Sequence, residues 1–370
     1  MIGRFKFLPE SLDQFKNLQT LDLRNNRLKS LPGTISTLTH LQRLLLDDND
    51  LTSVSDSLRC VKDLRELHLD GNRLSAIPTS LFFLSKLRTL SLYRNRIAVI
   101  PPRISRMVQL RELSLGRNQL KTLPGSLWQL KALRSLNLSE NHLTVLPKPM
   151  GALVHLQMLD LGHNQLRELP ETLGRLPRLT FLYLSHNRIS RVPASLFLQL
   201  RRLQYLNLTN NRLTELPDTI GSLVSLEELR LYNNKLRALP ESLFRLTSLN
   251  ELHLQDNELA SLPAGLGRLR NLRELRLSNN RITQLPPSVG ELSNLRYLDV
   301  RNSPLISLPA DLGRLRKLTH LDLRASKITN LPNSMRYLTY LQKLDLRWTK
   351  LSSVPKWIGL LKERGCSVLV

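Results

Sequence analysis

The sequence has few cysteines and no long apolar run, and each shortage excludes a class of protein. Two cysteines in 370 residues, Cys60 and Cys366, cannot form a disulfide framework, and neither belongs to a paired-cysteine metal motif. We expect both thiols to be small buried groups in a reducing compartment. Polar or charged residues interrupt every stretch long enough to cross a bilayer, and residues 1–10 hold no signal-peptide core. We therefore expect no transmembrane segment, no classical secretion and a cytoplasmic location.

Acidic residues are scarce relative to basic ones. The chain has 30 Asp and Glu against 54 Lys and Arg, which gives a formal net charge of +24. Such an excess is compatible with nucleic acid, an anionic membrane surface, an acidic partner or composition alone. With 41% apolar residues the chain can bury a large core, which excludes disorder.

One pattern, LxxLxLxxNxLxxLPxxLxxLxx, accounts for almost all of the chain. It begins at Leu18 and its last copy begins at Leu341, giving fifteen units. The spacing is 23 residues throughout, except between Leu179 and Leu203, where it is 24. A fixed period of this length is typical of stacked repeats.

The unit that begins at Leu133 illustrates the physics of one repeat. Leu136 and Leu138 alternate with polar neighbours and predict a short strand. Asn141 follows, where a buried side-chain amide can bond the backbone of the adjacent coil through its acceptor and its donors. Pro147 opens a short helical or extended return. Four apolar residues of the return should face the core: Leu143, Leu146, Met150 and Leu153.

A single unit cannot bury these leucines, but stacked units can. We therefore predict an α/β fold, a curved horseshoe-shaped solenoid. A parallel β-sheet should line its concave face, with short helical, 3₁₀ or extended segments on its convex face. The predicted organisation is a partial N-terminal repeat or cap (1–17), fifteen repeats (18–363) and a C-terminal capping strand (364–370).

The pattern resembles the leucine-rich repeat (LRR) family over residues 18–363. Its LP-containing 23-residue form is similar to plant intracellular Ras-group-related LRR proteins, the animal Ras–Raf LRR scaffold and bacterial LRR proteins. The resemblance implies a protein-binding scaffold. Four units depart from the pattern. Val54-Ser55 lacks the proline, and Ser303, Ser326 and Thr349 replace the asparagine, so we expect a weaker side-chain ladder there.

Specificity in such a solenoid should lie at the outward strand positions, five in each repeat. These seventy-five positions carry 16 basic and 16 acidic residues, which leaves 38 basic and 14 acidic residues for the convex face, edges and ends. The predicted concave face is therefore neutral overall, although it is basic in repeats four to six and acidic in repeats ten and eleven. Repeats eight and nine carry no charge there.

Aromatic residues gather in and beside this uncharged window. Low charge with aromatic anchors is characteristic of interface centres, although aromatic side chains also simply tolerate half-buried strand positions. The candidate partner-binding residues are Met158, His163, Phe181, Tyr183, His186, Tyr205 and Tyr232.

A second candidate patch lies in the last three repeats. Asp299, Asp322 and Asp345 form one predicted column beside a column of arginines. The favoured interpretation is a ladder in which the two columns pair with each other, and the alternative is a ligand site. The residues of this patch are Tyr297, Arg301, Arg324, Arg347 and Trp348.

The sequence contains no nucleophile with its base, no phosphate-binding loop and no metal motif. His163 and His186 share a predicted column, but two imidazoles with only Asp160 nearby make a poor metal site. We therefore expect no enzyme activity, no metal and no cofactor.

The sequence favours a scaffold or adaptor that binds a protein of unknown identity across its concave face, in intracellular signalling, with a monomer as the default state. The alternative is a bacterial LRR effector delivered into the host cytoplasm by a specialised secretion system. A weaker alternative is polyanion, nucleic-acid or anionic-membrane binding through the basic convex face and edges.

Overall fold

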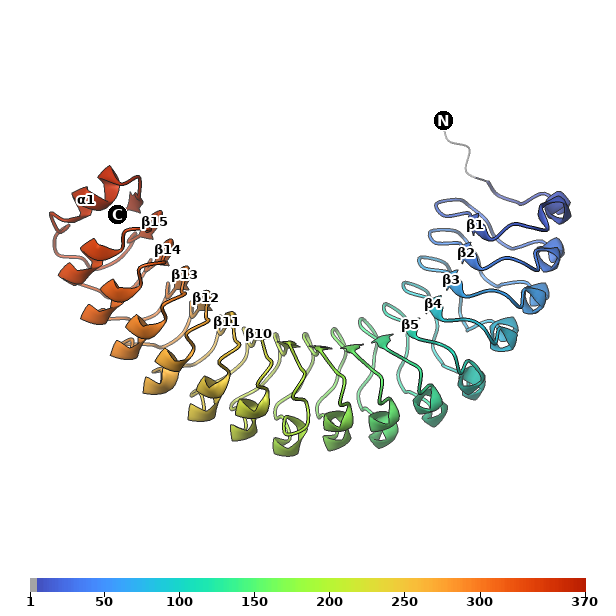
Figure 1. Ribbon diagram of the computed structural model, residues 1–370, viewed down its shortest axis with the longest axis horizontal. Coiled ribbons are helices and arrows are strands. Elements are labelled where there is room, and N and C mark those ends of the chain that lie inside the picture. Colours follow the sequence, from blue (N-terminus) through green and yellow to red (C-terminus); the bar gives the residue numbers. More distant parts are fainter. Residues whose placement is uncertain (1–4) are drawn as a thin grey trace. The chain divides into compact units, whose positions relative to one another are not determined.

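The computed structural model describes residues 5–370, so residues 1–4 of the expected N-terminal cap lie outside the described residues. The chain forms two compact units, one ending at Leu182 and the other spanning Tyr183–Val370. Each unit is a stack of coils, and each complete coil contributes one strand and one short 3₁₀ helix. In Figure 1 the strands of each unit line the inner side of its curve and the helices line the outer side.

Every strand is three residues long and occupies the predicted strand position of its repeat. The first unit holds β1 (Thr20–Asp22), β2 (Arg43–Leu45), β3 (Glu66–His68), β4 (Thr89–Ser91), β5 (Glu112–Ser114), β6 (Ser135–Asn137) and β7 (Met158–Asp160). Strand β8 (Phe181–Tyr183) contains residues of both units. The second unit holds β9 (Tyr205–Asn207), β10 (Glu228–Arg230), β11 (Glu251–His253), β12 (Glu274–Arg276), β13 (Tyr297–Asp299), β14 (His320–Asp322), β15 (Lys343–Asp345) and β16 (Ser367–Leu369).

Neighbouring strands within each unit pair in parallel and in register. Thr20 lies opposite Arg43 in the first unit, and Glu228 lies opposite Glu251 in the second. Equivalent repeat positions therefore form columns on the inner face, one residue per strand, with strands about 4.8 Å apart. The expected parallel solenoid is confirmed.

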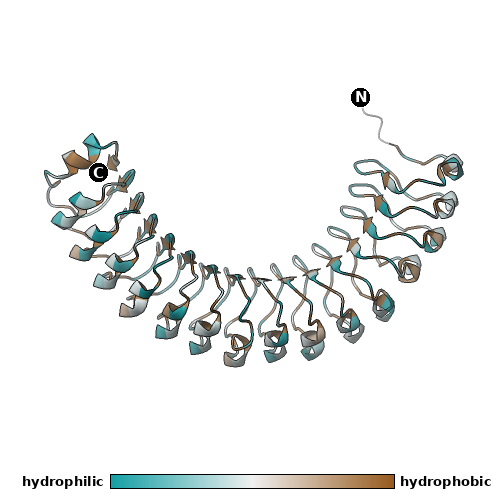
Figure 2. Cartoon of the chain, viewed as in Figure 1, coloured by the Kyte–Doolittle hydropathy of each residue, from teal (hydrophilic) through white to brown (hydrophobic). Residues whose placement is uncertain are grey.

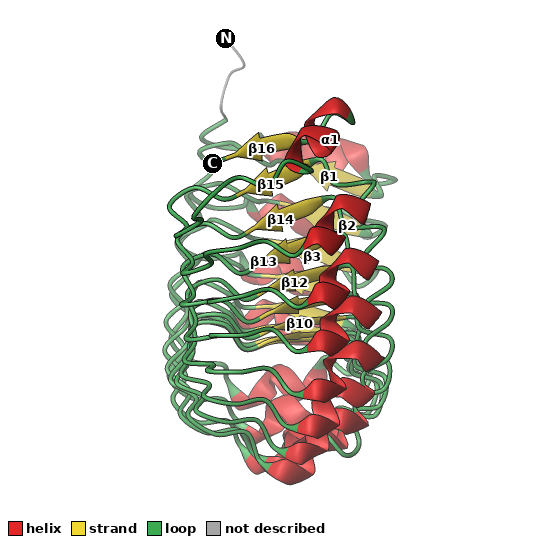
Figure 3. Cartoon of the chain, turned by 90° about the vertical axis from the view of Figure 1, so that its left-hand side faces the viewer, coloured by secondary structure: helices red, strands yellow, loops and turns green. Residues whose placement is uncertain are grey.

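The outer side of each coil is a 3₁₀ helix, usually introduced by the proline of the repeat. These helices are η1 (Glu10–Phe15), η2 (Gly33–Thr37), η3 (Asp56–Cys60), η4 (Thr79–Phe83), η5 (Pro102–Arg106), η6 (Gly125–Gln129), η7 (Lys148–Ala152), η8 (Glu171–Arg175), η9 (Ala194–Leu196), η10 (Asp218–Ser222), η11 (Glu241–Arg245), η12 (Ala264–Arg268), η13 (Pro287–Glu291), η14 (Ala310–Arg314) and η15 (Asn333–Tyr337). Figure 3 shows helices and strands of the second unit as two separate layers.

The repeat leucines form the core between these layers. In the unit that begins at Leu133, both strand leucines are fully buried, and Met150 and Leu153 close the core from the outer side with at most 1% exposure. Hydrophilic and apolar residues alternate along each coil in Figure 2. Each coil buries its leucines against the coils before and after it, so the stability of a coil depends on its neighbours.

The turn asparagine connects each coil to the one before it. Asn141 Nδ2 lies within 3.1 Å of the carbonyl oxygens of Leu115, Leu138 and Ser139. Its Oδ1 accepts the Leu120 N–H at 2.9 Å. Backbone groups that no strand pairing reaches are thereby satisfied without water. The same set of contacts recurs at Asn118, Asn234 and other repeats.

The expected weakening of this ladder near the C-terminus is confirmed. Ser303 Oγ accepts one long bond from the Asn280 N–H at 3.4 Å, and buried Ser326 Oγ has no partner among the described residues. The repeat without proline uses another device, because Ser55 Oγ accepts the Ser57 N–H at the start of η3.

The two ends of the described chain differ. The side chains of Phe5 and Phe7 are 59% and 71% exposed, although the Phe5 backbone bonds Asn26 and Arg27 of the first coil. At the other end α1 (Ile358–Glu363) buries Ile358 and Leu361, and β16 pairs with β15. No helix within residues 5–370 has the length and apolarity to span a bilayer.

The expectation that both cysteines are buried is wrong for Cys60. Cys366 is buried, and burial raises the pKa of its thiol. Cys60 is exposed because it ends η3 at a repeat position that faces solvent, where other repeats carry Arg106 or Gln129.

Replacement of Asn141 by alanine should lower the free energy of unfolding by about 2–4 kcal/mol, because it leaves several buried backbone groups without partners. Chemical denaturation measures the change. Asn330→Ala is the matched control, since Asn330 is exposed and, among residues 5–370, its side chain bonds only its neighbour Thr329. Equal effects of the two substitutions would contradict a structural role for the ladder.

Candidate functional site

Tyr183 and Tyr205 form a ring pair on the inner face of the second unit. Their centroids are 4.8 Å apart with a 38° angle between the planes. The Arg230 guanidinium lies 5.7 Å from the Tyr205 ring centroid, in cation–π range. Asn207 Nδ2 donates to the Tyr205 hydroxyl at 3.3 Å, and burial raises the pKa of that hydroxyl. The pair is half-buried and held in place, which reduces the entropy lost when a partner packs on it.

The other two second-unit candidates lie in the turns that follow strands β8 and β10. His186 lies in the turn after β8, where Asn210 Nδ2 is 2.9 Å from its Nε2. Tyr232 lies in the turn after β10 and is half-buried.

The three remaining candidates belong to the first unit. Phe181 is at the start of β8 and is 39% exposed. Met158 is half-buried at the start of β7, with the Ser135 hydroxyl 3.9 Å from its sulfur. His163 follows β7 in the left-handed backbone region, with φ of 53°.

A charged cluster on β10, β11 and β12 is part of the site that the sequence reasoning missed. His253 is only 7% exposed, and its Nε2 lies 3.1 Å from Glu251 Oε2 and 3.7 Å from Glu274 Oε1. Arg230 pairs with Glu228, and Arg276 pairs with Glu274. Reading the strand columns together, instead of counting charges per repeat, would have revealed this alternation.

The electrostatics of the cluster favour a neutral histidine. Burial lowers the pKa of His253 to about 4; Glu274 opposes the shift, and Arg230 and Arg276 add to it. Ligand atoms of Glu228, Glu251 and His253 lie within 4.8 Å of one another, so these three side chains could contact a cation. The existing pairing of Glu228 with Arg230 competes with that use.

The two columns of the last three repeats pair with each other, as the favoured interpretation expects. Arg324 Nη2 lies 2.6 Å from Asp322 Oδ2, and Arg347 Nη2 lies 2.8 Å from Asp345 Oδ2. Arg301 is looser, at 3.6 Å from Asp299 and 3.9 Å from Asp322. Asp299 is 1% exposed, and burial raises the pKa of its carboxyl.

The aromatic members of this patch flank the ladder. Arg276 lies 5.1 Å over the Tyr297 ring, which stacks on His320 at 5.8 Å. Trp348 is 73% exposed and contacts Arg347 at 5.5 Å. Its φ of 60° is in the left-handed region, which disfavours a bulky side chain. Asparagine or glycine occupies several equivalent turn positions, among them Asn25, Gly71 and Asn302.

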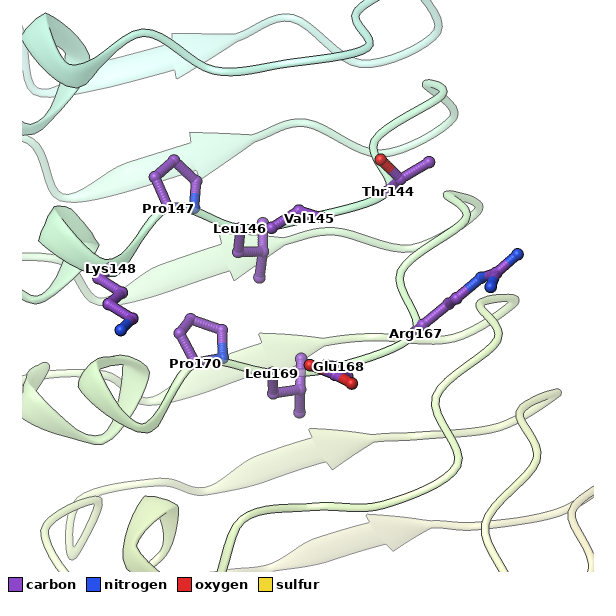
Figure 4. A pocket seen from close by; sticks show the side chains of 9 residues that line it. All are labelled: Thr144, Val145, Leu146, Pro147, Lys148, Arg167, Glu168, Leu169 and Pro170. Atoms are coloured by element: carbon purple, nitrogen blue, oxygen red, sulfur yellow. The ribbon is translucent and has the colours of Figure 1, made fainter.

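The first unit has a groove between return segments and a hollow on its inner face. Figure 4 shows a groove of about 780 Å³ between two return segments, lined mainly by apolar side chains such as Val145, Leu146 and Leu169. A second hollow of about 470 Å³ lies on the inner face. It is lined by Glu66, His68, Thr89, Leu90, Ser91, Glu112, Leu113, Ser114, Ser135, Asn137 and Met158.

Family models for leucine-rich repeats match the chain from residue 6 to residue 363. The model described as leucine-rich repeat region covers 121–199, 193–280 and 264–363, and the one described as leucine rich repeat covers 6–61 and 62–105. A two-copy repeat model covers 85–128. The chain belongs to the leucine-rich repeat family.

Solved structures agree with this assignment. A leucine-rich repeat protein of Leptospira interrogans is 32% identical over the full length of both chains, with a TM-score of 0.84. The Arabidopsis receptor kinase HAESA ectodomain, in complex with an IDA peptide hormone, is 28% identical at a TM-score of 0.69, with 93% of this chain and 64% of that chain covered. InlJ of Listeria monocytogenes shares the fold at 24% identity and a TM-score of 0.77, covering 90% and 68%. No curated protein matched the chain.

The family and its structural relatives support a protein-interaction module as the general class.

The buried position of His253 predicts a pH dependence of stability. An unfolded histidine binds its proton near pH 6.5, whereas folded His253 does so only near pH 4. Its contribution is therefore complete above pH 6.5 and is lost as the pH falls towards 4, by about 3 kcal/mol in all. Denaturation at pH 7 and pH 5 should show a loss in the native chain that exceeds the loss in His253→Gln by about 2 kcal/mol. Identical losses in the two chains would contradict the buried neutral imidazole.

Proposed function

We propose that the chain captures a protein partner on its inner face, with Tyr183 and Tyr205 as the anchors. The ring pair, with Arg230 over Tyr205, is the observation that carries this proposal. Aromatic and arginine side chains dominate the energetics of protein interfaces, especially where they are partly desolvated and preorganised. The pair also lies in the two repeats whose outward strand positions carry no charge. A partner that covers the pair therefore removes water from no charged residue at those positions.

The charged cluster on β10 to β12 would then set which partner binds. Glu251 has a side chain 40% exposed, and Arg230 and Arg276 side chains are 36% and 38% exposed, so acidic and basic groups alternate beside the ring pair. Such a border favours a partner with complementary alternating charge and disfavours uniformly charged surfaces. Phe181, Met158 and His163 of the first unit, together with His186 and Tyr232, are proposed as further contacts.

The relatives support a protein or peptide ligand. The HAESA ectodomain, 28% identical to this chain, was solved in complex with a peptide hormone. We propose a scaffold or adaptor role in cytoplasmic signalling, without catalysis. The exposed free thiol of Cys60 is compatible with a reducing compartment.

A second candidate function is that of a bacterial LRR protein that acts on a host protein after delivery into the host. The likeness to the Leptospira interrogans protein over the full length of both chains supports this candidate, because that relative is bacterial. Both candidates use the inner face for binding, and they differ in the cell from which the partner comes.

Loss of the two anchors should abolish partner capture and leave folding intact. Tyr183→Ala with Tyr205→Ala removes the ring pair, and we expect at least a hundredfold loss of affinity, since each anchor contributes about 2 kcal/mol or more. Affinity purification with mass spectrometry at moderate salt identifies the partner, and calorimetry then measures the affinity.

Tyr340→Ala is the matched control, because Tyr340 is 67% exposed and lies in the turn between η15 and β15. Native affinity in the double variant, or an equal loss in the control, would refute the anchors.

A further inference from the structure

Four arginines occupy the same column of the first unit in consecutive repeats. Arg65, Arg88, Arg111 and Arg134 each lie directly before a strand, and all four are exposed. The N–H of Arg88 donates to the carbonyl of Arg65 at 2.8 Å, Arg111 donates to Arg88 at 2.7 Å and Arg134 donates to Arg111 at 2.7 Å. The four residues are therefore immediate neighbours across the edge of the sheet, and we refer to them as the arginine stripe.

No ion pair compensates the charge of the stripe within the described part of the chain, although Asp63 attracts Arg65 over a longer distance. Among the described residues no carboxylate lies within ion-pair distance of any of the four guanidiniums, whereas the other four inner-face arginines of this unit are paired, beginning with Arg24 on Asp22. Arg43 Nε lies 2.8 Å from Glu66 Oε2, Arg94 pairs with Asp48, and Arg117 Nε is 3.7 Å from Glu140. Like charges side by side on adjacent strands repel one another and destabilise the sheet. An anionic ligand would relieve that repulsion.

The surroundings of the stripe favour a polypeptide over other polyanions. The 470 Å³ hollow is lined by the strands that directly follow the stripe, with hydroxyl and amide groups at Ser114, Ser135 and Asn137 that can bond a peptide backbone. Glu66 and Glu112 also line it, and they would repel a ligand with a charge on every unit, such as a phosphate backbone, whereas a peptide can place uncharged side chains beside them. Apart from His68, the lining offers no ring on which a base could stack.

The dimensions also fit an extended chain. Four strands about 4.8 Å apart span about 14 Å, and side chains at i, i+2 and i+4 of an extended segment span about 13 Å on one face. Three alternate acidic residues could therefore contact all four guanidiniums at once. A guanidinium group has the geometry to bond both oxygens of a carboxylate.

We propose that the arginine stripe binds an extended acidic segment of a protein, with its alternate carboxylates on Arg65, Arg88, Arg111 and Arg134 and its backbone facing the hollow. This inference rests on the proposed function, because it names the chemistry of a partner region that the first unit recognises. It is also independent of the ring pair, which belongs to the second unit.

A labelled twelve-residue peptide in which glutamate alternates with serine is the probe, with fluorescence anisotropy as the readout at two salt concentrations. The test variant is Arg88→Gln with Arg111→Gln. Arg273→Gln with Arg296→Gln is the matched control, because these two arginines are also exposed, unpaired in the described residues and joined by an N–H to carbonyl bond of 2.8 Å. Both variants lower the net charge of +24 by two. We expect the test variant to bind the probe at least tenfold more weakly and the control within about twofold of the native chain.

Three results would overturn the inference. They are absence of probe binding by the native chain, equal weakening in both variants, and tighter binding of poly(U) or anionic vesicles with the same dependence on Arg88 and Arg111. Circular dichroism of each variant establishes that it is folded. The Tyr183 and Tyr205 variants should bind the probe normally, so loss of the stripe and loss of the anchors are distinguishable.

Discussion

The bond network of the turn asparagine is the constraint on which the rest of the structure depends. The side chain of Asn141 bonds backbone groups of its own coil and of the preceding coil, and equivalent residues do the same in most repeats. Because this network fixes the register of each coil against the next, equivalent residues fall into columns. The columns turn a linear repeat into a surface on which residues 23 positions apart are neighbours. The surface offered to a partner is therefore built from columns of equivalent repeat positions and not from residues that are consecutive in the sequence.

Different columns carry different kinds of side chain, and the overall composition does not reveal this difference. The excess of basic residues lies mostly outside the inner face, and the inner face alternates between paired and unpaired charge. The Asp322–Arg324 and Asp345–Arg347 pairs neutralise each other and stabilise the last coils, whereas the arginine stripe has no such partners among the described residues. Unpaired charge and preorganised rings are the features that a partner can use, so the two proposed binding regions differ in chemistry and in the unit that carries them.

Sequence reasoning predicted the fold well because the same pattern of buried leucines recurs in fifteen repeats. It also predicted the roles of Asn141 and of the Asp–Arg columns, since both follow from register. It was wrong about Cys60, because exposure at the end of a 3₁₀ helix depends on a helical phase that the leucine pattern does not specify. It missed His253 and the contact of Arg230 with Tyr205, because side-chain conformers decide those contacts. The partner-binding roles of all seven candidate residues, Tyr183 and Tyr205 included, stay predictions.

Recognition through the inner face is the central claim, and photo-cross-linking tests it most directly. Two variants are compared, one with a photoreactive phenylalanine analogue at position 205 and the other with the analogue at position 340. Each variant reports whether a partner in a lysate contacts the surface around that position. The account predicts a discrete adduct from position 205 that the native chain competes away, and none from position 340. An adduct from position 340 with none from position 205 would contradict it.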